Sequence, residues 1–272
     1  MKLTSKQLIL GVAVNTTSYQ DTASTISNWI EEQRKFPTLP ARYVCVTSVH
    51  GVMTAQEDKN FREILNNADI VTPDGMPIVW AMRSFGHRDQ ERVYGPDLML
   101  ILCQQAAHLG HRVFLFGSQP ETLVWLEDAL LRRCPGLQVV GKLSPPFRPP
   151  TPDEDLTHVR TIRESKADII FVGLSTPKQE RWMQAHQSSL PGTVLLGVGA
   201  AFDFHAGCVR QAPHWIRRAG LEWLFRLSME PRRLWRRYLL ITPRFLPFWA
   251  LQRAGLLRYT SSAKSTTQTL SE

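Results

Sequence analysis

One carboxylate stands at the kind of joint where α/β enzymes place reacting groups. Asp74 follows residues 69–72, a short segment with apolar residues at 70 and 71 that predicts a strand, and precedes a stretch from Pro77 with the composition of a helix. Pro73 and Gly75 punctuate the chain between the two. Open α/β sheets bind ligands at the carboxyl ends of their strands, so this position favours chemistry. The alternative is that Asp74 caps the helix, because Asp is among the preferred N-cap residues.

Other expected strands also end in polar or glycine-rich joints. A parallel sheet gathers such joints along one edge. Glycine lets backbone N–H groups approach a phosphate, and helix N-termini attract one, so a diphosphate ligand fits there. No joint is a GxGxxG fingerprint or a Walker loop, and each alone is more typical of a turn. The joints lie at residues 47–48, 72–75, 117–118, 173–180 and 197–199.

The elements that must position these joints predict an α/β fold. Strands that are apolar throughout, alternating with helices, are typical of a Rossmann-like, mainly parallel sheet covered by helices on both faces. The expected strands lie at residues 7–14, 43–47, 69–72, 112–116, 137–141, 168–172 and 193–198. Helical stretches are expected at residues 21–35, from after residue 51 to 65, and at 96–109, 121–133, 153–166 and 177–187.

Length and cysteine usage narrow the class of protein. A chain of 272 residues is long enough for one large α/β domain or for one domain plus an appendage. Its four cysteines are far apart in sequence, so no zinc or redox pair is predicted. No secretory signal is visible, and the apolar run at residues 8–14 is too short to span a bilayer. We expect a cytoplasmic enzyme of bacterial type.

The positive charge is concentrated at the C-terminal end. From Arg210 onward the sequence holds twelve Lys and Arg against three Asp and Glu, a net charge of +9, which leaves −1 of the total +8 for the rest. Four of the eight tryptophans are also there. A basic, tryptophan-rich end indicates an anionic partner. We therefore expect an α/β domain at 1–207, a basic aromatic helical appendage at 208–258 and a disordered tail at 259–272.

Five motifs in series resemble the WecG/TagA/CpsF family of glycosyltransferases. In order, they occupy residues 72–77 (TPDGMP), 92–97 (RVYGPD), 172–180 (VGL and PKQE), 199–203 (GAAFD) and 220–233 (GLEWLFR and EPRR). The resemblance covers roughly residues 8–245. It implies an inverting hexosyltransferase that moves a sugar, often of N-acetylmannosamine type, from a UDP-sugar to a glycan on undecaprenyl diphosphate. That reaction belongs to exopolysaccharide and cell-wall synthesis at the inner face of the plasma membrane, and it implies neither a cofactor nor a metal.

The resemblance also assigns roles to residues. Asp74 matches the general base, which takes the proton of the acceptor hydroxyl. Thr47 matches a threonine beside the reacting sugar, but Val49 stands where the family often has Asn, with His50 next. His50 could share the acid–base work, although a lone histidine in a loop is more often solvated. The remaining substrate-binding candidates are Arg92, Gly95, Asp97, Gly117, Gly173, Pro177, Lys178, Gln179, Gly199 and Asp203.

Several of these residues have plain structural alternatives. Arg92 and Asp97 flank a Gly-Pro turn, where a salt bridge and an N-cap would explain them. Glu180 would favour a helix N-terminus in any protein. Residues 153–155 match the DxD pattern of metal-dependent glycosyltransferases, but they open a helix after Pro152, so capping explains them.

Arginines interleave with aromatic and aliphatic residues in the appendage. Basic amphipathic helices that carry Trp bind at membrane interfaces, and each basic residue near an anionic surface contributes about 1 kcal/mol. The resemblance adds a second role, in which arginines fold over the active site and neutralise a diphosphate. The alternative is a helix that packs its aromatics on the body and leaves its arginines in water. The candidate arginines are Arg217, Arg226, Arg233, Arg236 and Arg237.

Two other functions fit parts of the sequence. A nucleotide-binding oxidoreductase fits the strand–helix alternation, but the first strand carries no GxGxxG motif. A binder of nucleic acid or another anionic polymer would use the Arg/Trp end, but the near-neutral body and the lack of a binding motif argue against it. The glycosyltransferase hypothesis instead expects a UDP-sugar, a lipid-linked acceptor and an anionic membrane as partners, and no nucleic acid. Exposed aromatics could alternatively form a homo-oligomer.

Overall fold

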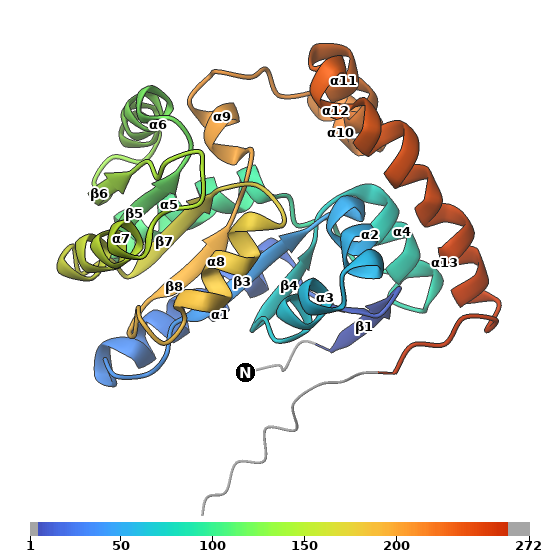
Figure 1. The fold of residues 1–272 in the computed structure, drawn as a ribbon, viewed down its shortest axis with the longest axis horizontal. Helices are drawn as coiled ribbons and strands as arrows, with labels where there is room; N and C mark the ends of the chain where they lie inside the picture. Colours follow the sequence, from blue (N-terminus) through green and yellow to red (C-terminus); the bar gives the residue numbers. More distant parts are fainter. Residues whose placement is uncertain (1–4, 261–272) are drawn as a thin grey trace, which may run out of the picture.

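Six parallel strands form the central sheet of the protein, in the order β4-β3-β8-β7-β5-β6 (Figure 1). The computed structural model describes residues 5–260 of the 272-residue chain. The last of these strands in sequence, β8, lies at the centre of the sheet, between β3 and β7. The strands are β3 (Arg42–Thr47), β4 (Ile70–Pro73), β5 (Arg112–Gly117), β6 (Gln138–Leu143), β7 (Ile169–Gly173) and β8 (Val194–Gly197).

Helices cover both faces of the sheet, which confirms the predicted α/β fold. Tyr43 and Cys45 of β3 pack into the apolar layer on one face, while Val44 and Val46 pack into the layer on the other. Neighbouring residues of one strand must all be apolar in such a sheet, because both of its faces are buried. The first layer uses α2 (Val49–Glu57), α3 (Lys59–Asn66), α4 (Met76–Ser84), α7 (Pro152–Glu164) and α8 (Lys178–His186), and the second uses α1 (Tyr19–Lys35), α5 (Gly95–Leu109) and α6 (Pro120–Arg133).

The N-terminal strand expected at residues 7–14 is instead a hairpin. β1 (Lys6–Ile9) and β2 (Val12–Asn15) pair in antiparallel fashion around Leu10 and Gly11, whose φ angles are 47° and 79°. A left-handed turn is rare for leucine, and this is why a continuous apolar run concealed the reversal. The hairpin is fixed beside β4, where the Asn15 side chain accepts a hydrogen bond from the Val71 amide at 2.8 Å.

Two helix boundaries follow from capping side chains. The single helix expected to end at residue 65 is divided into α2 and α3 by Asp58, whose carboxylate accepts the Phe61 amide at 2.9 Å. At the start of α7, Thr151 and Glu154 form a capping box. The DxD match at residues 153–155 is therefore the first turn of a capped helix, as the capping alternative predicted. Within residues 5–260, no three His, Cys, Asp or Glu side chains are placed to hold a metal ion.

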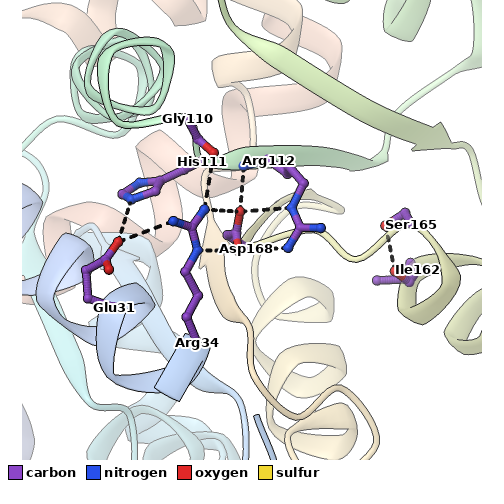
Figure 2. Close-up of polar contacts among 8 residues, drawn as sticks. All are labelled: Glu31, Arg34, Gly110, His111, Arg112, Ile162, Ser165 and Asp168. Carbon is purple, nitrogen blue, oxygen red and sulfur yellow. Dashed lines mark hydrogen bonds and ion pairs between the residues drawn. The ribbon is translucent and has the colours of Figure 1, made fainter. Parts of the chain in front are cut away.

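An ion cluster around the buried Asp168 lies at the amino ends of β5 and β7. Asp168 accepts hydrogen bonds from the side chains of Arg34 and Arg112 and from the Arg112 backbone amide, as Figure 2 shows. These bonds outweigh burial and lower the pKa of Asp168. Arg112 opens β5 and Asp168 immediately precedes β7, so the cluster lies at the opposite edge of the sheet from the strand ends expected to carry the site.

The chain after β8 forms a helical arm that returns along the body (Figure 1). Leu234, Tyr238 and Phe245 of the arm are buried. Trp249 donates a hydrogen bond to Ser84 at 3.2 Å, and Tyr259, in the predicted tail, donates one to Gln56 at 2.9 Å. The rest of that tail, residues 261–272, lies outside the described residues. The arm comprises α9 (Ala201–His205), α10 (His214–Arg218), α11 (Glu222–Met229), α12 (Pro231–Trp235), the π-helix η1 (Arg236–Ile241), the 3₁₀ turn η2 (Thr242–Arg244) and α13 (Phe245–Arg253).

Candidate active site

A cleft with about 1170 Å³ of empty space, part of it open to solvent, lies at the carboxyl ends of the sheet strands. Its walls come from the joints after β3, β4, β7 and β8 and from the C-terminal arm. Asp74 and Gln179 face this one cleft from opposite sides of the central strand. A concave site at this edge of the sheet is where open α/β folds bind their ligands.

Asp74 belongs to an ion triad and is not a helix cap. The N-cap position of α4 is Gly75, which leaves the Asp74 side chain free for other contacts. Arg92 donates to Asp74 Oδ1 from Nε at 3.0 Å and from Nη2 at 2.8 Å. Arg92 Nη1 lies 2.8 Å from Oε2 of Glu222, at the start of α11. The capping alternative is therefore wrong, and the carboxylate is held by a guanidinium that a second carboxylate shares.

Burial decides the protonation chemistry of Asp74. Its side chain is 19% exposed, and loss of water raises its pKa. The positive charge of Arg92 opposes this rise, while the negative charge of Glu222 adds to it, and the net direction is upward. A carboxylate that holds a proton more tightly than usual is a stronger general base near neutral pH.

Asp97 pairs with the arm and not with Arg92. Arg217 of α10 lies 3.1 and 3.2 Å from the two carboxylate oxygens of Asp97, so the structural alternative of a salt bridge between Arg92 and Asp97 is wrong. Both arginines also contact the ring of Tyr94, with the Arg92 guanidinium 4.1 Å and the Arg217 guanidinium 5.3 Å from its centroid. Residues 92–97 therefore join the body to the arm.

The start of α8 presents an oriented amide to the cleft. Gln179 donates from Nε2 to Oε1 of the buried Glu180 at 3.0 Å, and Thr176 donates to the same oxygen at 2.8 Å. Burial raises the pKa of Glu180. The bond to Glu180 fixes the Gln179 amide so that its Oε1, which has no partner within the described residues, remains an acceptor. Glu180 therefore orients Gln179, a role beyond favouring the helix N-terminus.

Cationic groups from the arm face the cleft without acidic partners. Within residues 5–260, neither Arg226 nor Arg237 has a carboxylate within 4 Å of its charged nitrogens, whereas Arg233 pairs with Glu230. Arg237 donates to Ser48 at 3.3 Å, and its buried Nε has no hydrogen-bond partner. Burial lowers the pKa of Arg237. Such a site stabilises an anion, because unpaired cations are costly to enclose.

His50 and Asp203 complete the polar lining. His50 lies on α2, and burial together with the charge of Arg237 lowers its pKa to about 4, so the imidazole is neutral at pH 7. Asp203 on α9 accepts a long hydrogen bond of 3.5 Å from Ser118, and burial raises its pKa. Both side chains face the cleft. His50 is therefore not the solvated loop residue that the alternative described.

Some predicted site residues lie outside the cleft. Thr47 is buried, and its hydroxyl has no hydrogen-bond partner within the described part of the chain. Gly117 and Gly173 serve packing, because a Cβ on Gly117 would lie 2.6 Å from the Gly173 carbonyl oxygen. The predicted residues that line the cleft are Asp74, Arg92, Gln179, Gly199, Asp203, Arg226, Arg233 and Arg237, and those that do not are Thr47, Gly95, Asp97, Gly117, Gly173, Pro177, Lys178, Arg217 and Arg236.

Sequence reasoning missed Glu222 as a site residue. A signal was present, because Glu222 is one of only three acidic residues from Arg210 onward and stands in a segment otherwise rich in arginine. Tyr94 was also missed, although it lies inside the RVYGPD motif. The other unpredicted polar residues that line the cleft are Ser48, Ser175, Thr176, Tyr238 and Thr242.

A family model and named relatives match this chain over most of its length. The model of the glycosyl transferase WecG/TagA/CpsF family matches residues 7–259. A relative from Staphylococcus aureus (strain MW2) is 29% identical over 237 residues, 86% of this chain and 88% of the relative. Another, from Bacillus subtilis (strain 168), is 29% identical over 188 residues, 69% of this chain and 71% of the relative. Both are named N-acetylglucosaminyldiphosphoundecaprenol N-acetyl-beta-D-mannosaminyltransferase. The chain belongs to the WecG/TagA/CpsF family of glycosyltransferases.

Proposed function

We propose that this glycosyltransferase moves an N-acetylmannosamine-type sugar from UDP to an N-acetylglucosamine diphosphate carried on undecaprenol. The observation that carries the proposal is one cleft in which an enclosed carboxylate, Asp74, lies together with the unpaired arginines Arg226 and Arg237. Acid–base work and diphosphate stabilisation are the two tasks of such a transfer. The names of the two relatives supply the sugar and the acceptor.

The contacts of Asp74 suit proton removal. Both hydrogen bonds from Arg92 go to Oδ1, which leaves Oδ2 to accept the proton of the acceptor hydroxyl. The oxygen of the acceptor hydroxyl forms a bond to the anomeric carbon on the face opposite the diphosphate. At the same time the bond between that carbon and the diphosphate oxygen breaks, and UDP departs with the electron pair. The sugar is inverted in one displacement. Asp74 then releases its proton to solvent.

Other cleft residues bind the donor. Arg226 and Arg237 stabilise the charge that develops on the departing diphosphate, and a site that excludes water strengthens that effect. Gln179 Oε1 accepts a hydrogen bond from a donor hydroxyl or amide. Asp203 accepts from the uracil N–H or the ribose hydroxyls. No step in this scheme assigns a task to a metal ion.

A transfer assay tests the proposal. Purified full-length protein is incubated with a short-chain polyprenyl-diphosphate N-acetylglucosamine and, in parallel, with the UDP derivatives of N-acetylmannosamine, N-acetylglucosamine and glucose. We expect a disaccharide-lipid, identified by mass spectrometry, with the N-acetylmannosamine donor, and no product when the acceptor lacks its sugar. Thermal stabilisation by NAD or an oligonucleotide and none by UDP would contradict the proposal, because only a bound ligand stabilises the fold.

We further propose that the arm holds the protein on an anionic membrane surface. Several large apolar side chains of the arm are exposed. Exposed apolar patches mark sites of contact with a membrane or another protein. Within residues 5–260, no helix combines the length and apolar character needed to cross a bilayer. The proposed contact is interfacial, with arginines beside lipid phosphates. The exposed apolar residues are Trp215, Leu221, Trp223, Leu224, Met229, Trp235, Leu239, Leu240, Leu246, Leu251 and Leu256.

A double substitution, Leu239→Ser with Leu240→Ser, is expected to weaken binding to vesicles. Each side chain is 54% exposed, so the change leaves the fold intact while it removes apolar surface that would enter the interface. Loss of two leucines that would be partly buried in the membrane interface is expected to reduce the partition coefficient between vesicles and water by about tenfold or more. Sedimentation with vesicles that contain anionic lipid measures this, and binding should also fall as salt rises.

The matched control is Val124→Ser with Trp125→Ser on α6, where the exposed fractions are 52% and 54%. These residues belong to another part of the surface, so vesicle binding should stay unchanged. Deletion of the whole arm is a poorer test, because Tyr238 and Phe245 are buried in the fold. A Leu239/Leu240 variant that binds vesicles normally but changes in molecular mass would instead assign this surface to a homo-oligomer.

A further inference from the structure

Glu222 is a cleft residue that the proposed displacement does not use. It opens α11, and its side chain is 12% exposed. Oε2 lies 2.8 Å from Arg92 Nη1, and Oε1 accepts a hydrogen bond from the Tyr94 hydroxyl at 3.0 Å. An acid from the arm is therefore held at both oxygens by the body, beside the candidate base.

Arg92 serves two carboxylates through different nitrogens. Its Nε and Nη2 bind Asp74, its Nη1 faces Glu222, and its guanidinium carbon lies over the Tyr94 ring. A guanidinium that is shared between two carboxylates neutralises each of them less than a guanidinium paired with one. The presence of Glu222 therefore raises the pKa of Asp74 and makes its carboxylate a stronger base than it would be in a simple Asp74–Arg92 pair.

We propose that Glu222 is a positioning residue that shares Arg92 with Asp74 and thereby keeps the Asp74 carboxylate ready to take the proton of the acceptor hydroxyl. This inference rests on the proposed function of Asp74. The helix α11 also carries Arg226 and leads through α12 to Arg237. One segment of the arm therefore supplies the arginines proposed to bind the diphosphate and the glutamate that strengthens Asp74 as a base. The base is thereby coupled to the docked position of the arm.

The charges around Asp74 fix the sign of the expected effect. Arg92 and, from α11, Arg226 lower the pKa of Asp74, while Glu222 raises it. The other titratable groups that line the cleft or interact with Asp74 are Tyr19, Tyr94, His50, Asp203, Arg233, Arg237 and Tyr238. Loss of the Glu222 charge should therefore lower the pKa of Asp74. A base works when deprotonated, so the acid limb of the rate profile should move to lower pH.

The variant Glu222→Gln tests this directly. Glutamine keeps the size of the side chain and an oxygen for the Tyr94 hydroxyl, but it removes the charge. We expect the acid limb of kcat against pH to move down by about one pH unit. The plateau at higher pH should fall about threefold, because a weaker base transfers protons less effectively. Damage to structure alone would lower the whole profile and leave its midpoint in place.

Two further variants bracket the result. Glu222→Asp retains the charge. Its acid limb should lie close to that of the wild type, displaced by no more than about a quarter of the shift seen for Glu222→Gln. Glu91→Gln removes an exposed carboxylate one residue before Arg92 and should leave the profile of the wild type unchanged. If Glu222→Gln fails to fold, as judged by its thermal melt, Tyr94→Phe takes its place, since it removes one of the two bonds that hold Glu222.

A second readout needs no sugar transfer. Carbon-13 NMR of the Asp and Glu carboxyl groups in the full chain, with Asp74 assigned from Asp74→Asn, gives the titration midpoint of Asp74 in wild type and Glu222→Gln. A lower midpoint in the variant supports the inference, and an unchanged midpoint overturns it. A protein that transfers no sugar but shows the shift would refute the proposed function alone. Active protein with no shift would refute the role of Glu222 alone.

Discussion

Asp74→Asn is expected to abolish most sugar transfer while the protein still binds UDP-sugar. Asparagine has the size of aspartate, and its side-chain oxygen can still accept the bonds from Arg92 that measure 2.8 and 3.0 Å. An amide cannot take the proton of the acceptor hydroxyl. General base catalysis contributes about 10²- to 10⁴-fold, so kcat should fall by about that factor. Steady-state assays measure kcat, and calorimetry measures the affinity for UDP.

The control for this variant is Asp89→Asn, which changes an exposed carboxylate in the segment that precedes Arg92. It should leave both kcat and UDP affinity as in the wild type. Unchanged turnover in Asp74→Asn would remove Asp74 from the role of base. A loss of UDP affinity as large as the loss of turnover would assign the residue to donor binding instead.

Arg237→Met should move stability and ligand affinity in opposite directions. Arg237 has a buried Nε without a partner, and within residues 5–260 it forms no ion pair. Hydrogen bonds to charged groups contribute about 1.5–3 kcal/mol, so UDP should bind about 10- to 100-fold more weakly. Without ligand, the variant should melt at a higher temperature, because an enclosed and unpaired cation has been replaced by an apolar side chain of similar length.

Calorimetry with UDP and thermal melts of the ligand-free protein measure the two effects. Arg232→Met is the matched control, since Arg232 lies five residues earlier in the same arm and is exposed. It should alter neither quantity by a measurable amount. A variant at Arg237 that loses stability and keeps its affinity would show that the guanidinium supports the fold and does not bind the diphosphate.

The fold was predictable where one local pattern decides the outcome. Residues 43–46 and 169–172, within two of the strands, are apolar at every position, which signals a sheet buried on both faces. The hairpin at residues 6–15 was missed because Leu10 adopts a left-handed conformation that apolar runs do not announce. Strand order was likewise out of reach, because the place of a strand in a sheet depends on packing between distant segments.

The positions of several site residues were predictable from the sequence, but their ion-pair partners were not. The position of Asp74 after a strand and of Gln179 at a helix start could be inferred from motifs and turns. Arg92 pairs with Asp74 and Glu222, and Asp97 pairs with Arg217. These pairings depend on how the arm, which lies more than one hundred residues later in sequence, docks on the body. Ion-pair choice of this kind is a tertiary property.

The central place of β8 has a consequence for synthesis on the ribosome. β3 pairs with β8 through Arg42 and Val194, so the innermost ladder of the sheet must wait until almost three quarters of the chain has been made. Until then β3 and β7 lack a partner on the edge that each will turn to β8, and nascent chains with such unpaired edges are prone to aggregate. Cells that make this enzyme should therefore depend on chaperones during translation, more than the modest size of the protein would suggest.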